Sequence, residues 1–443
     1  MLFISHLLLG ALWASFARSQ DITLTGSPKT ASSASQSVPT GSYVSYTTTV
    51  TEPSGSAFTS TGSRSVSGGG SGLVESGSGV TTSTRGSRTI VEGTVPATPS
   101  NSASASASGG NSSTLVPPPN IQGCNLFPQF CNRTYSNITE VCAHNSMFDS
   151  PGDAASNQEL PVTTQLNDGI RMLQGQTHTV NGTLRFCHTS CDILDAGPVV
   201  DYLTTVRQWV QSHPYDVVTI LLANGDYDDV NSFTGPIRDS GLETYAYVPP
   251  KIPMGIQDWP TLGNMILQGK RVIFFMDYKA DQSSVPYILD EFSQMWETPF
   301  DPTDDTFPCT VQRPPGQTDQ EREQKLYLLN HNLNQDINLL GASLSVPNTV
   351  AMNVTNNVTG PGSLGFTTSG CTSLYNRPPK FLLVDYYNRD NGTVFQVAAN
   401  HNNVTYDRPC CGLPTSAASQ GQHRLLPSAI LVALVSALAI VAF

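Results

Sequence analysis

The chain has 443 residues and a formal net charge of −12, from 22 lysines and arginines against 34 aspartates and glutamates. The acidic excess lies in residues 119–412, which hold 16 basic and 30 acidic side chains. No basic patch stands out anywhere in the sequence, so we expect no nucleic-acid partner.

The N-terminus has the features of an export signal. Its first nineteen residues, "MLFISHLLLGALWASFARS", hold an apolar run that ends in small residues. This pattern predicts a secretory signal peptide over residues 1–19, cleaved after Ala17 or Ser19.

The C-terminus has the features of an anchor signal. Residues 413–443 run from small residues through a polar spacer to an apolar tail of 15 residues that begins at Ala429. This order predicts a GPI-anchor signal, with the anchor placed near Ser416 to Ser419. A single-pass anchor is the alternative, but the tail is shorter than the ~20 residues that a membrane span needs. Either anchor predicts an extracellular protein tethered to a membrane, at the plasma membrane or cell wall.

Residues 20–118 are rich in Ser, Thr and Gly, with stretches such as "SGGGSG" and "SASASASGG". Because they hold few large apolar side chains, they cannot bury enough surface to offset the entropy lost on ordering. We interpret this segment as a disordered, O-glycosylated stalk.

Cysteines and glycosylation sequons fit an exported protein. The nine cysteines all lie between Cys124 and Cys411, which predicts a disulfide framework in that region, with one cysteine left over and the connectivity open. Asn-x-Ser/Thr sequons, which indicate a glycosylated surface, occur at Asn111, Asn132, Asn137, Asn181, Asn353, Asn357, Asn391 and Asn403.

Residues 119–412 alternate between two kinds of apolar pattern. Continuous runs that predict strands buried on both faces occupy 217–224, 271–278, 325–332 and 380–387. Helix-like stretches occupy 197–213, 259–268 and 285–297. This alternation predicts an α/β fold with a parallel sheet, either a barrel or a doubly wound fold, and the size suits a (β/α) barrel.

Five polar residues stand where apolar strands are expected to end: His144, His188, Asn224, Asp277 and Asp385. In a parallel barrel such residues converge on the rim at the carboxyl ends of the strands. Two histidines at one rim suit phosphodiester chemistry, because one imidazole can accept a proton while the other donates one. A carboxylate bonded to the first histidine would fix its tautomer.

Simpler interpretations exist for the same residues. A lone histidine near a strand end is more often structural, and we place His178, His213, His331 and His401 in that class. The stretch "CHTSC" (187–191) is open to a metal knuckle, a Cys187–Cys191 loop staple or two separate disulfides. The Asn-Ser after His144 is also suited to capping a helix.

Several stretches in a fixed order carry a family resemblance: "CAHNSMF", "QLNDGIRMLQGQTH", "LRFCHTSC", "VRQWVQSHPYDVVTILLAN", "GKRVIFFMDY" and "FLLVDYYN". Over about 140 to 388 the chain resembles the phosphatidylinositol-specific phospholipase C X-domain superfamily, in particular the secreted fungal PLC-like phosphodiesterases. The resemblance implies a distorted TIM barrel. It also implies a phospholipid or glycolipid substrate, cleaved by intramolecular phosphoryl transfer to a cyclic inositol phosphate.

The resemblance implies specific roles. His144 matches the general base that deprotonates the inositol 2-hydroxyl, and His188 matches the general acid for the leaving glycerol oxygen. Asp385 matches the carboxylate that orients His144. Asn145 matches a calcium ligand of the eukaryotic members, and here it is expected to hydrogen-bond the phosphate instead. Asn224, Asp277 and Lys279 are further expected substrate contacts.

The sequence departs from the family at the phosphate. Metal-dependent members carry an acidic pair after "GIR", where this chain has Gln174 and Gln176. We therefore expect no metal and no cofactor. The bacterial members place an arginine at the second of these positions, and their next basic position is Asp277 here. The missing charge is left to Arg171, Arg185 or Lys279, although Arg171 is better suited to a structural place beneath the rim.

Three functions compete. The first is an extracellular, metal-independent phosphodiesterase of the phospholipase C type. The second is a metal-dependent glycerophosphodiester phosphodiesterase, which the two glutamines argue against. The third is a catalytically degenerate barrel kept as a GPI-anchored surface or wall protein.

Overall fold

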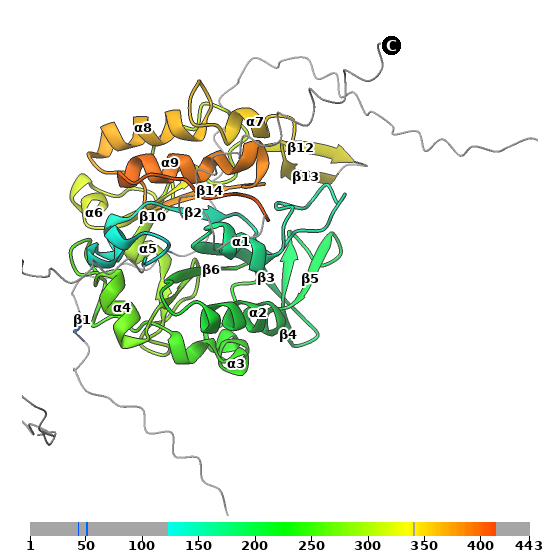
Figure 1. Cartoon of the computed structure of the whole chain (residues 1–443). Helices are drawn as coiled ribbons and strands as arrows, with labels where there is room; N and C mark the ends of the chain where they lie inside the picture. The colour runs from blue at the N-terminus through cyan, green and yellow to red at the C-terminus, as the bar shows by residue number, and fades with distance from the viewer. Residues whose placement is uncertain (1–42, 44–49, 52–122, 340–341, 413–443) are drawn as a thin grey trace, which may run out of the picture. The chain divides into compact units, whose positions relative to one another are not determined.

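The computed structural model describes Tyr43, residues 50–51, residues 123–339 and residues 342–412 (Figure 1). The predicted signal peptide (1–19) and anchor signal (413–443) lie outside the described residues. Of the predicted stalk, the structure describes only Tyr43 and the short strand β1 (Val50–Thr51). No helix in the described part of the chain is long and apolar enough to cross a membrane.

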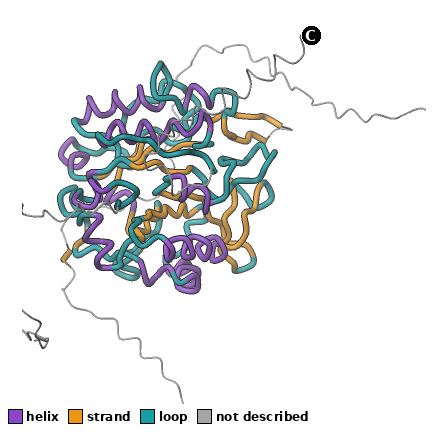
Figure 2. The backbone as a smooth tube through the Cα atoms, viewed as in Figure 1, coloured by secondary structure: helices purple, strands orange, loops and turns teal. Residues whose placement is uncertain are grey.

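The domain is built around eight parallel strands of a ten-stranded sheet, drawn in orange in Figure 2. Their order is β10-β11-β14-β2-β3-β6-β8-β9. The predicted strands at 217–224, 271–278, 325–332 and 380–387 correspond to β6, β8, β11 and β14. In chain order the eight strands are β2 (Glu140–Ala143), β3 (Met172–Val180), β6 (Val218–Asn224), β8 (Val272–Met276), β9 (Ile288–Asp290), β10 (Met295–Glu297), β11 (Leu326–Asn330) and β14 (Phe381–Val384).

The two edges of this sheet are consecutive in the chain. Strands β9 and β10 stand at opposite ends of the order, yet only α5 (Glu291–Gln294) separates them. Laid flat, eight strands would span ~34 Å at their usual spacing, whereas the chain from Asp290 to Met295 reaches ~18 Å at most. The sheet must therefore curl until its edges meet. The predicted distorted α/β barrel is confirmed, with a seam between β9 and β10 that no ladder among the described residues closes.

Both faces of the sheet are buried. Leu328 and Leu383 belong to the apolar cluster inside the barrel, whereas their chain neighbours Leu329 and Val384 belong to the cluster beneath the helices. This alternation follows from the pleat of a strand. It explains why the strands appear in the sequence as continuous apolar runs.

Helices surround the sheet (Figures 1 and 2). The predicted helices at 197–213 and 259–268 correspond to α2 and α4. The helices are α1 (Val162–Asp168), α2 (Val199–Ser212), α3 (Asn231–Ser240), α4 (Leu262–Gln268), α6 (Asp319–Glu323), α7 (Met352–Thr355), α8 (Leu364–Tyr375) and α9 (Thr393–Asn402), with 3-10 turns η1 (Pro128–Asn132), η2 (Tyr135–Asn137), η3 (Leu242–Tyr245) and η4 (Arg389–Gly392).

Two antiparallel additions accompany the barrel and lie on the right of Figure 1. Strand β4 (Thr183–His188) turns back along β3 and pairs with β5 (Leu194–Pro198). Strands β12 (Asn334–Leu339) and β13 (Ala342–Pro347) form a separate hairpin after β11. A further short strand, β7 (Lys251–Ile252), pairs with β1.

The helix predicted over 285–297 is wrong. That stretch forms strand β9, the single turn α5 and strand β10. Its apolar residues recur at a helix-like spacing because two short strands flank one helical turn. Ile288 pairs toward β8 and Trp296 toward β11, and both side chains are fully buried.

Eight of the nine cysteines are paired, and the ninth, Cys142, is free and fully buried in β2. The loop staple considered for Cys187 and Cys191 is present. The disulfides are Cys124–Cys131, Cys187–Cys191, Cys309–Cys371 and Cys410–Cys411.

Loop length predicts which disulfide matters most for stability. Cys309–Cys371 closes a separation of 62 residues, against 4 for Cys187–Cys191. Replacing both cysteines of the long loop by serine should lower the free energy of unfolding by about 4 kcal/mol, and of the short loop by about 2 kcal/mol. Urea unfolding of the two double variants measures both losses, and the reverse order would contradict the assignment.

Candidate active site

Strand register brings the expected catalytic residues together. Val384 of β14 pairs with Ala143 of β2, so Asp385 and His144 follow side by side on neighbouring strands. Ala143 also pairs with Leu173 of β3, which puts Gln174 in the same row. Residues at one level of parallel strands point to the same face. His144, Gln174 and Asp385 therefore form a polar layer at the carboxyl end of the barrel.

His144 and Asp385 form a buried pair. The Nδ1 atom of His144 lies 2.7 Å from Oδ1 of Asp385, and the two residues are 6% and 0% exposed. Asn157 Nδ2 donates to the same carboxylate oxygen at 2.9 Å. With Nδ1 bound to the carboxylate, Nε2 of His144 is left without a hydrogen bond to any described residue, and it is the nitrogen available for acid–base chemistry.

His188 ends strand β4 beside this pair. The ring of Phe148 packs against its imidazole with 5.4 Å between ring centroids, and Thr189 Oγ1 lies 3.3 Å from its Nδ1. Burial, and then the charge of nearby His144, lower the pKa of His188 to about 4. The two histidines are thus close enough for the charge of His144 to lower the pKa of His188.

The two histidines differ in proton affinity. Burial alone would lower the pKa of His144, but the charge and hydrogen bond of Asp385 outweigh burial and raise that pKa above 6.5. Since the pKa of His188 is lowered, a single proton on the pair rests on His144. Two titratable groups held apart in this way suit paired acid–base work.

The side chains of Gln174 and Gln176 bind the backbone immediately after His144 and His188, respectively. Oε1 of Gln174 accepts from the backbone N–H of Asn145 at 2.8 Å, and Oε1 of Gln176 accepts from that of Thr189 at 2.9 Å. Each acceptor residue thus fixes the backbone just after a histidine. Asn145 and Thr189 have φ of 45° and 61°, the left-handed region that a β-branched residue such as Thr rarely adopts.

The residues at the mouth do not fit the calcium ion of the metal-dependent members. Calcium requires 6–8 oxygen ligands, usually with several carboxylates. Here the two family positions are neutral amides whose oxygens already accept backbone hydrogen bonds. The described residues offer one cluster of three side chains of metal-ligating kinds, Asp168 with Cys410 and Cys411, and those cysteines are joined in a disulfide.

The expected substrate contacts differ in how far their polar atoms are already bonded within the protein. They are Asn145, Asn224, Asp277 and Lys279. Asn145 is 6% exposed, and its Oδ1 has no hydrogen-bond partner among the described residues. Lys279 is exposed and forms no ion pair within the described part of the chain. Both remain candidates for substrate contact.

Asn224 and Asp277 shape the loops after β6 and β8. Asn224 Nδ2 donates to the carbonyls of Asp228 and Tyr278, and its Oδ1 accepts from the N–H of Asp228. Asp277 Oδ1 accepts from the N–H groups of Asn224 and Tyr278. Burial raises the pKa of Asp277 to about 6. The hydrogen-bonding capacity of Asn224 is used within the protein, so we assign it a positioning role.

Arg313 is a basic residue that sequence reasoning missed. Its guanidinium lies 3.4 Å from Glu297 and 3.7 Å from Asp277, with Phe292 and Phe300 rings at 4.8 and 4.5 Å. Burial would lower its pKa, but Glu297 and the neighbouring carboxylates raise it, so Arg313 stays charged. Arg313 lies in the loop after β10, and in the sequence it does not follow an apolar strand, so the strand-end pattern did not identify it.

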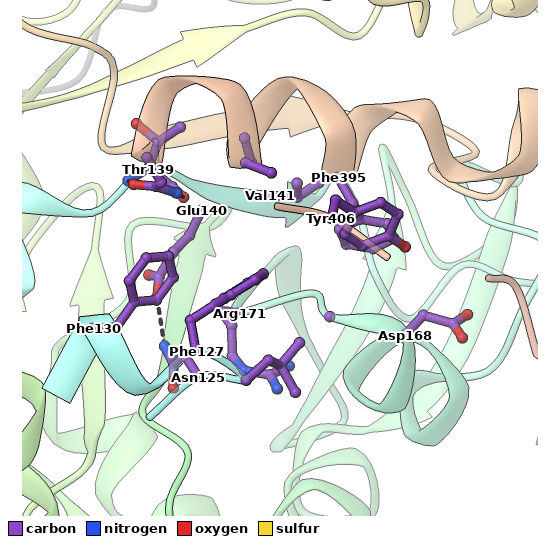
Figure 3. A pocket seen from close by; sticks show the side chains of 15 residues that line it. Asn125, Phe127, Phe130, Thr139, Glu140, Val141, Asp168, Arg171, Phe395 and Tyr406 are labelled. Atoms are coloured by element: carbon purple, nitrogen blue, oxygen red, sulfur yellow. Dashed lines mark hydrogen bonds between the residues drawn. The ribbon is translucent and has the colours of Figure 1, made fainter. Parts of the chain in front are cut away.

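Arg171, which was considered for the phosphate and for a structural place beneath the rim, lies in a structural environment. It precedes β3, at the amino end of the barrel, and pairs with Asp216 at 2.7 Å. Its Nη1 donates to the carbonyls of Leu166 and Ile170. It lines a small cavity of about 40 Å³ together with Asn125 and Glu140. Figure 3 labels these three side chains around the pocket. It therefore cannot serve as a phosphate ligand at the other end, because an apolar interior fills the space between.

The other basic candidate, Arg185, also has a partner. It lies on β4 and forms an ion pair with Asp195 of β5 at 2.8 Å. This pair links the two strands that carry the His188 loop. Of the three basic residues considered for the phosphate, Lys279 is the one without an ion pair in the described residues.

Asn157 and Gln158 are positioning residues that the sequence did not single out. Asn157 binds Asp385, and Gln158 Nε2 donates to the carbonyls of His144 and Val384 at 2.8 and 3.1 Å. Both side chains are almost fully buried. They lie in an irregular loop, where strand-end reasoning does not reach.

Comparison with known proteins decides the family. The model of the PI-PLC X family (PI-PLC X 1) matches residues 130–402. The chain belongs to this family. A protein of Arthroderma benhamiae named "Uncharacterized secreted protein" is 56% identical over 305 residues, 68% of this chain and 69% of that protein. The "PI-PLC X domain-containing protein 1" of the same organism is 44% identical over 266 residues, 59% of this chain and 84% of that protein.

Among solved structures, the phosphatidylinositol-specific phospholipase C from Listeria monocytogenes matches with a TM-score of 0.39 and 13% identity, over 62% of this chain and 97% of that one. The family membership that the sequence resemblance implied is thus confirmed by the family model and the relatives.

The structural role of Arg171 is testable. Arg171→Leu leaves Asp216 buried without its partner, which should lower the free energy of unfolding by about 3–5 kcal/mol. Adding Asp216→Leu should recover part of that loss. Urea unfolding measures both, and turnover per folded molecule should stay unchanged. A loss of turnover at unchanged stability would return Arg171 to the site.

Proposed function

We propose that this chain is a phosphoric diester hydrolase of the phospholipase C type, acting on an inositol phospholipid or a related phosphodiester. The observation that carries the proposal is the buried His144–Asp385 hydrogen bond beside a second histidine with a lowered pKa. Membership in the PI-PLC X family supports the same chemistry.

The mechanism assigns one proton transfer to each histidine. Nε2 of His144 accepts the proton of the attacking substrate hydroxyl, whose oxygen forms the new bond to phosphorus. His188 donates a proton to the oxygen that leaves as the phosphorus–oxygen bond breaks. Asp385 holds the His144 ring and stabilises the imidazolium that forms.

Without substrate, the single proton of the pair rests on His144, although His144 must be unprotonated to act as the base. An anionic phosphodiester beside His188 changes this, because a negative charge raises the pKa of a neighbouring imidazole. Substrate binding thus draws the proton toward His188. Asn145, with its unpartnered Oδ1, and Lys279 are the proposed contacts to the substrate.

A second candidate is a degenerate barrel that no longer turns over. The mouth favours it because the carboxylates of Asp277 and Glu297 surround Arg313, and developing negative charge on phosphorus needs positive charge nearby. An intact His144–Asp385 pair argues against it, since a scaffold has no need of an oriented histidine.

The proposed setting is extracellular. The relative named as a secreted protein and the four disulfides support export. Tethering through a lipid anchor rests on residues 413–443 and remains a proposal.

Release of soluble inositol phosphate from phosphatidylinositol vesicles by the secreted protein tests the function. We expect release with and without EDTA, because glutamines occupy the two positions where metal-dependent members carry their acidic pair. His144→Ala should reduce turnover by about 10²- to 10⁴-fold. No release by the folded protein favours the second candidate, and loss on chelation would reveal a metal site.

The histidine pair predicts a bell-shaped pH profile of kcat/KM. The active form carries one proton on the pair, so activity should fall below about pH 4, where His188 also protonates, and above the raised pKa of His144. Asp385→Asn removes the charge that raises the pKa of His144 and should move the alkaline limb to lower pH. An alkaline limb that stays in place would contradict the pairing.

A further inference from the structure

One residue from the N-terminal segment packs at the seam of the barrel. The ring of Tyr43 lies 4.9 Å from that of Phe292 and 6.0 Å from that of Tyr278, both edge-on. Phe292 belongs to α5, the turn that links the two unpaired edges of the sheet, and is fully buried. Tyr278 follows β8 and is 5% exposed. Tyr43 therefore contacts the turn that links the two edges of the sheet and the loop that follows β8.

A second contact fixes the same segment seven residues later. Strand β1 pairs antiparallel with β7, Val50 with Ile252 and Thr51 with Lys251. Lys251 and Tyr43 line one hollow of about 680 Å³, together with Met254, Ser293, Gln317 and Lys325. The two contacts thus belong to one surface.

The sequence of this segment suits such a surface. "YVSYTTTVT" (43–51) is uncharged and consists of aromatic, β-branched and serine residues, which favour extended backbone. It differs from the Gly- and Ser-rich sequence that follows. The hollow carries both signs of charge, with Lys251 paired to Asp258 at 2.6 Å, so a neutral strand meets no net field there.

We propose that this hollow is a docking groove for the chain's own N-terminal segment, with Tyr43 and Val50–Thr51 as its two anchors. The Tyr43 anchor covers the α5 turn. Phe292, which Tyr43 covers, is one of the rings that pack on Arg313. Docking therefore keeps water from the Arg313–Glu297 pair at the mouth. The inference holds whether or not the barrel turns over phosphodiesters.

Hydrogen exchange on the full secreted chain tests the docking. Tyr43→Ala should speed exchange of the Lys251–Ile252 amides and of α5 by about tenfold, because ring contacts that hold the segment are lost. Tyr43→Phe keeps the ring contacts and loses only the hydroxyl hydrogen bond to Tyr278, so its exchange should lie between that of the wild type and that of Tyr43→Ala. Tyr215→Ala, which removes a tyrosine that is 45% exposed elsewhere, is the matched control and should leave both regions unchanged. Equal exchange in Tyr43→Ala and wild type would overturn the proposal.

A cleavage experiment identifies the occupant. A protease site inserted within residues 60–110 of the full chain allows the segment to be cut from the domain after folding. Retention of the fragment on gel filtration in the wild type, and its loss in Tyr43→Ala, is the expected result. Immediate release from the wild type would overturn the docking. A concentration-dependent dimer would show that the groove takes a second copy and would overturn the intramolecular form.

Discussion

The buried hydrogen bond between His144 and Asp385 is the contact on which the rest of the site depends. It joins two residues 241 positions apart, and it exists because β14 and β2 pair in one register. A slip of one residue would turn one of the two side chains to the opposite face of the sheet. The register is itself held by the apolar layers on both faces, so the packing of the barrel determines the chemistry at its mouth.

The polar side chains that bind the His144–Asp385 pair and the backbone around it are neutral amides. Asn157 and Gln158 bind the carboxylate and the backbone of the pair, while Gln174 and Gln176 hold the residues after each histidine. A neutral amide donates or accepts without altering the proton balance of the histidines. The same choice leaves the mouth poor in positive charge, since Arg313 faces carboxylates. The histidines are thus oriented by neutral amides, and of the basic residues considered for the phosphate, Lys279 is the one without an ion pair among the described residues.

Strand ends were the part of the site that the sequence could predict. His144 and Asp385 each follow an apolar run, and parallel strands bring such positions together. His188 also ends an apolar run, but its strand β4 runs antiparallel to β3 and reaches the site by turning back along that strand. Arg171 did not follow this rule because it precedes its apolar run, which places it at the opposite end of the barrel. Arg313 and Asn157 lie in irregular loops, whose course depends on tertiary packing that no local pattern records.

The fold was predictable to a similar degree. Long apolar runs identified β6, β8, β11 and β14, because a strand buried on both faces needs such a run. The stretch 285–297 was misassigned since two three-residue strands are too short to show their own periodicity. The contacts of Tyr43 were not foreseen either, because composition averaged over 20–118 hides one short β-prone stretch.

The seam between β9 and β10 gives the barrel a property that a closed barrel lacks. In a fully paired barrel, the number of strands and their stagger fix the diameter. Here the α5 turn replaces a ladder, so the two edges can separate slightly without breaking a main-chain hydrogen bond between them. The width of the barrel at this place is therefore set by the packing of α5 and not by strand pairing.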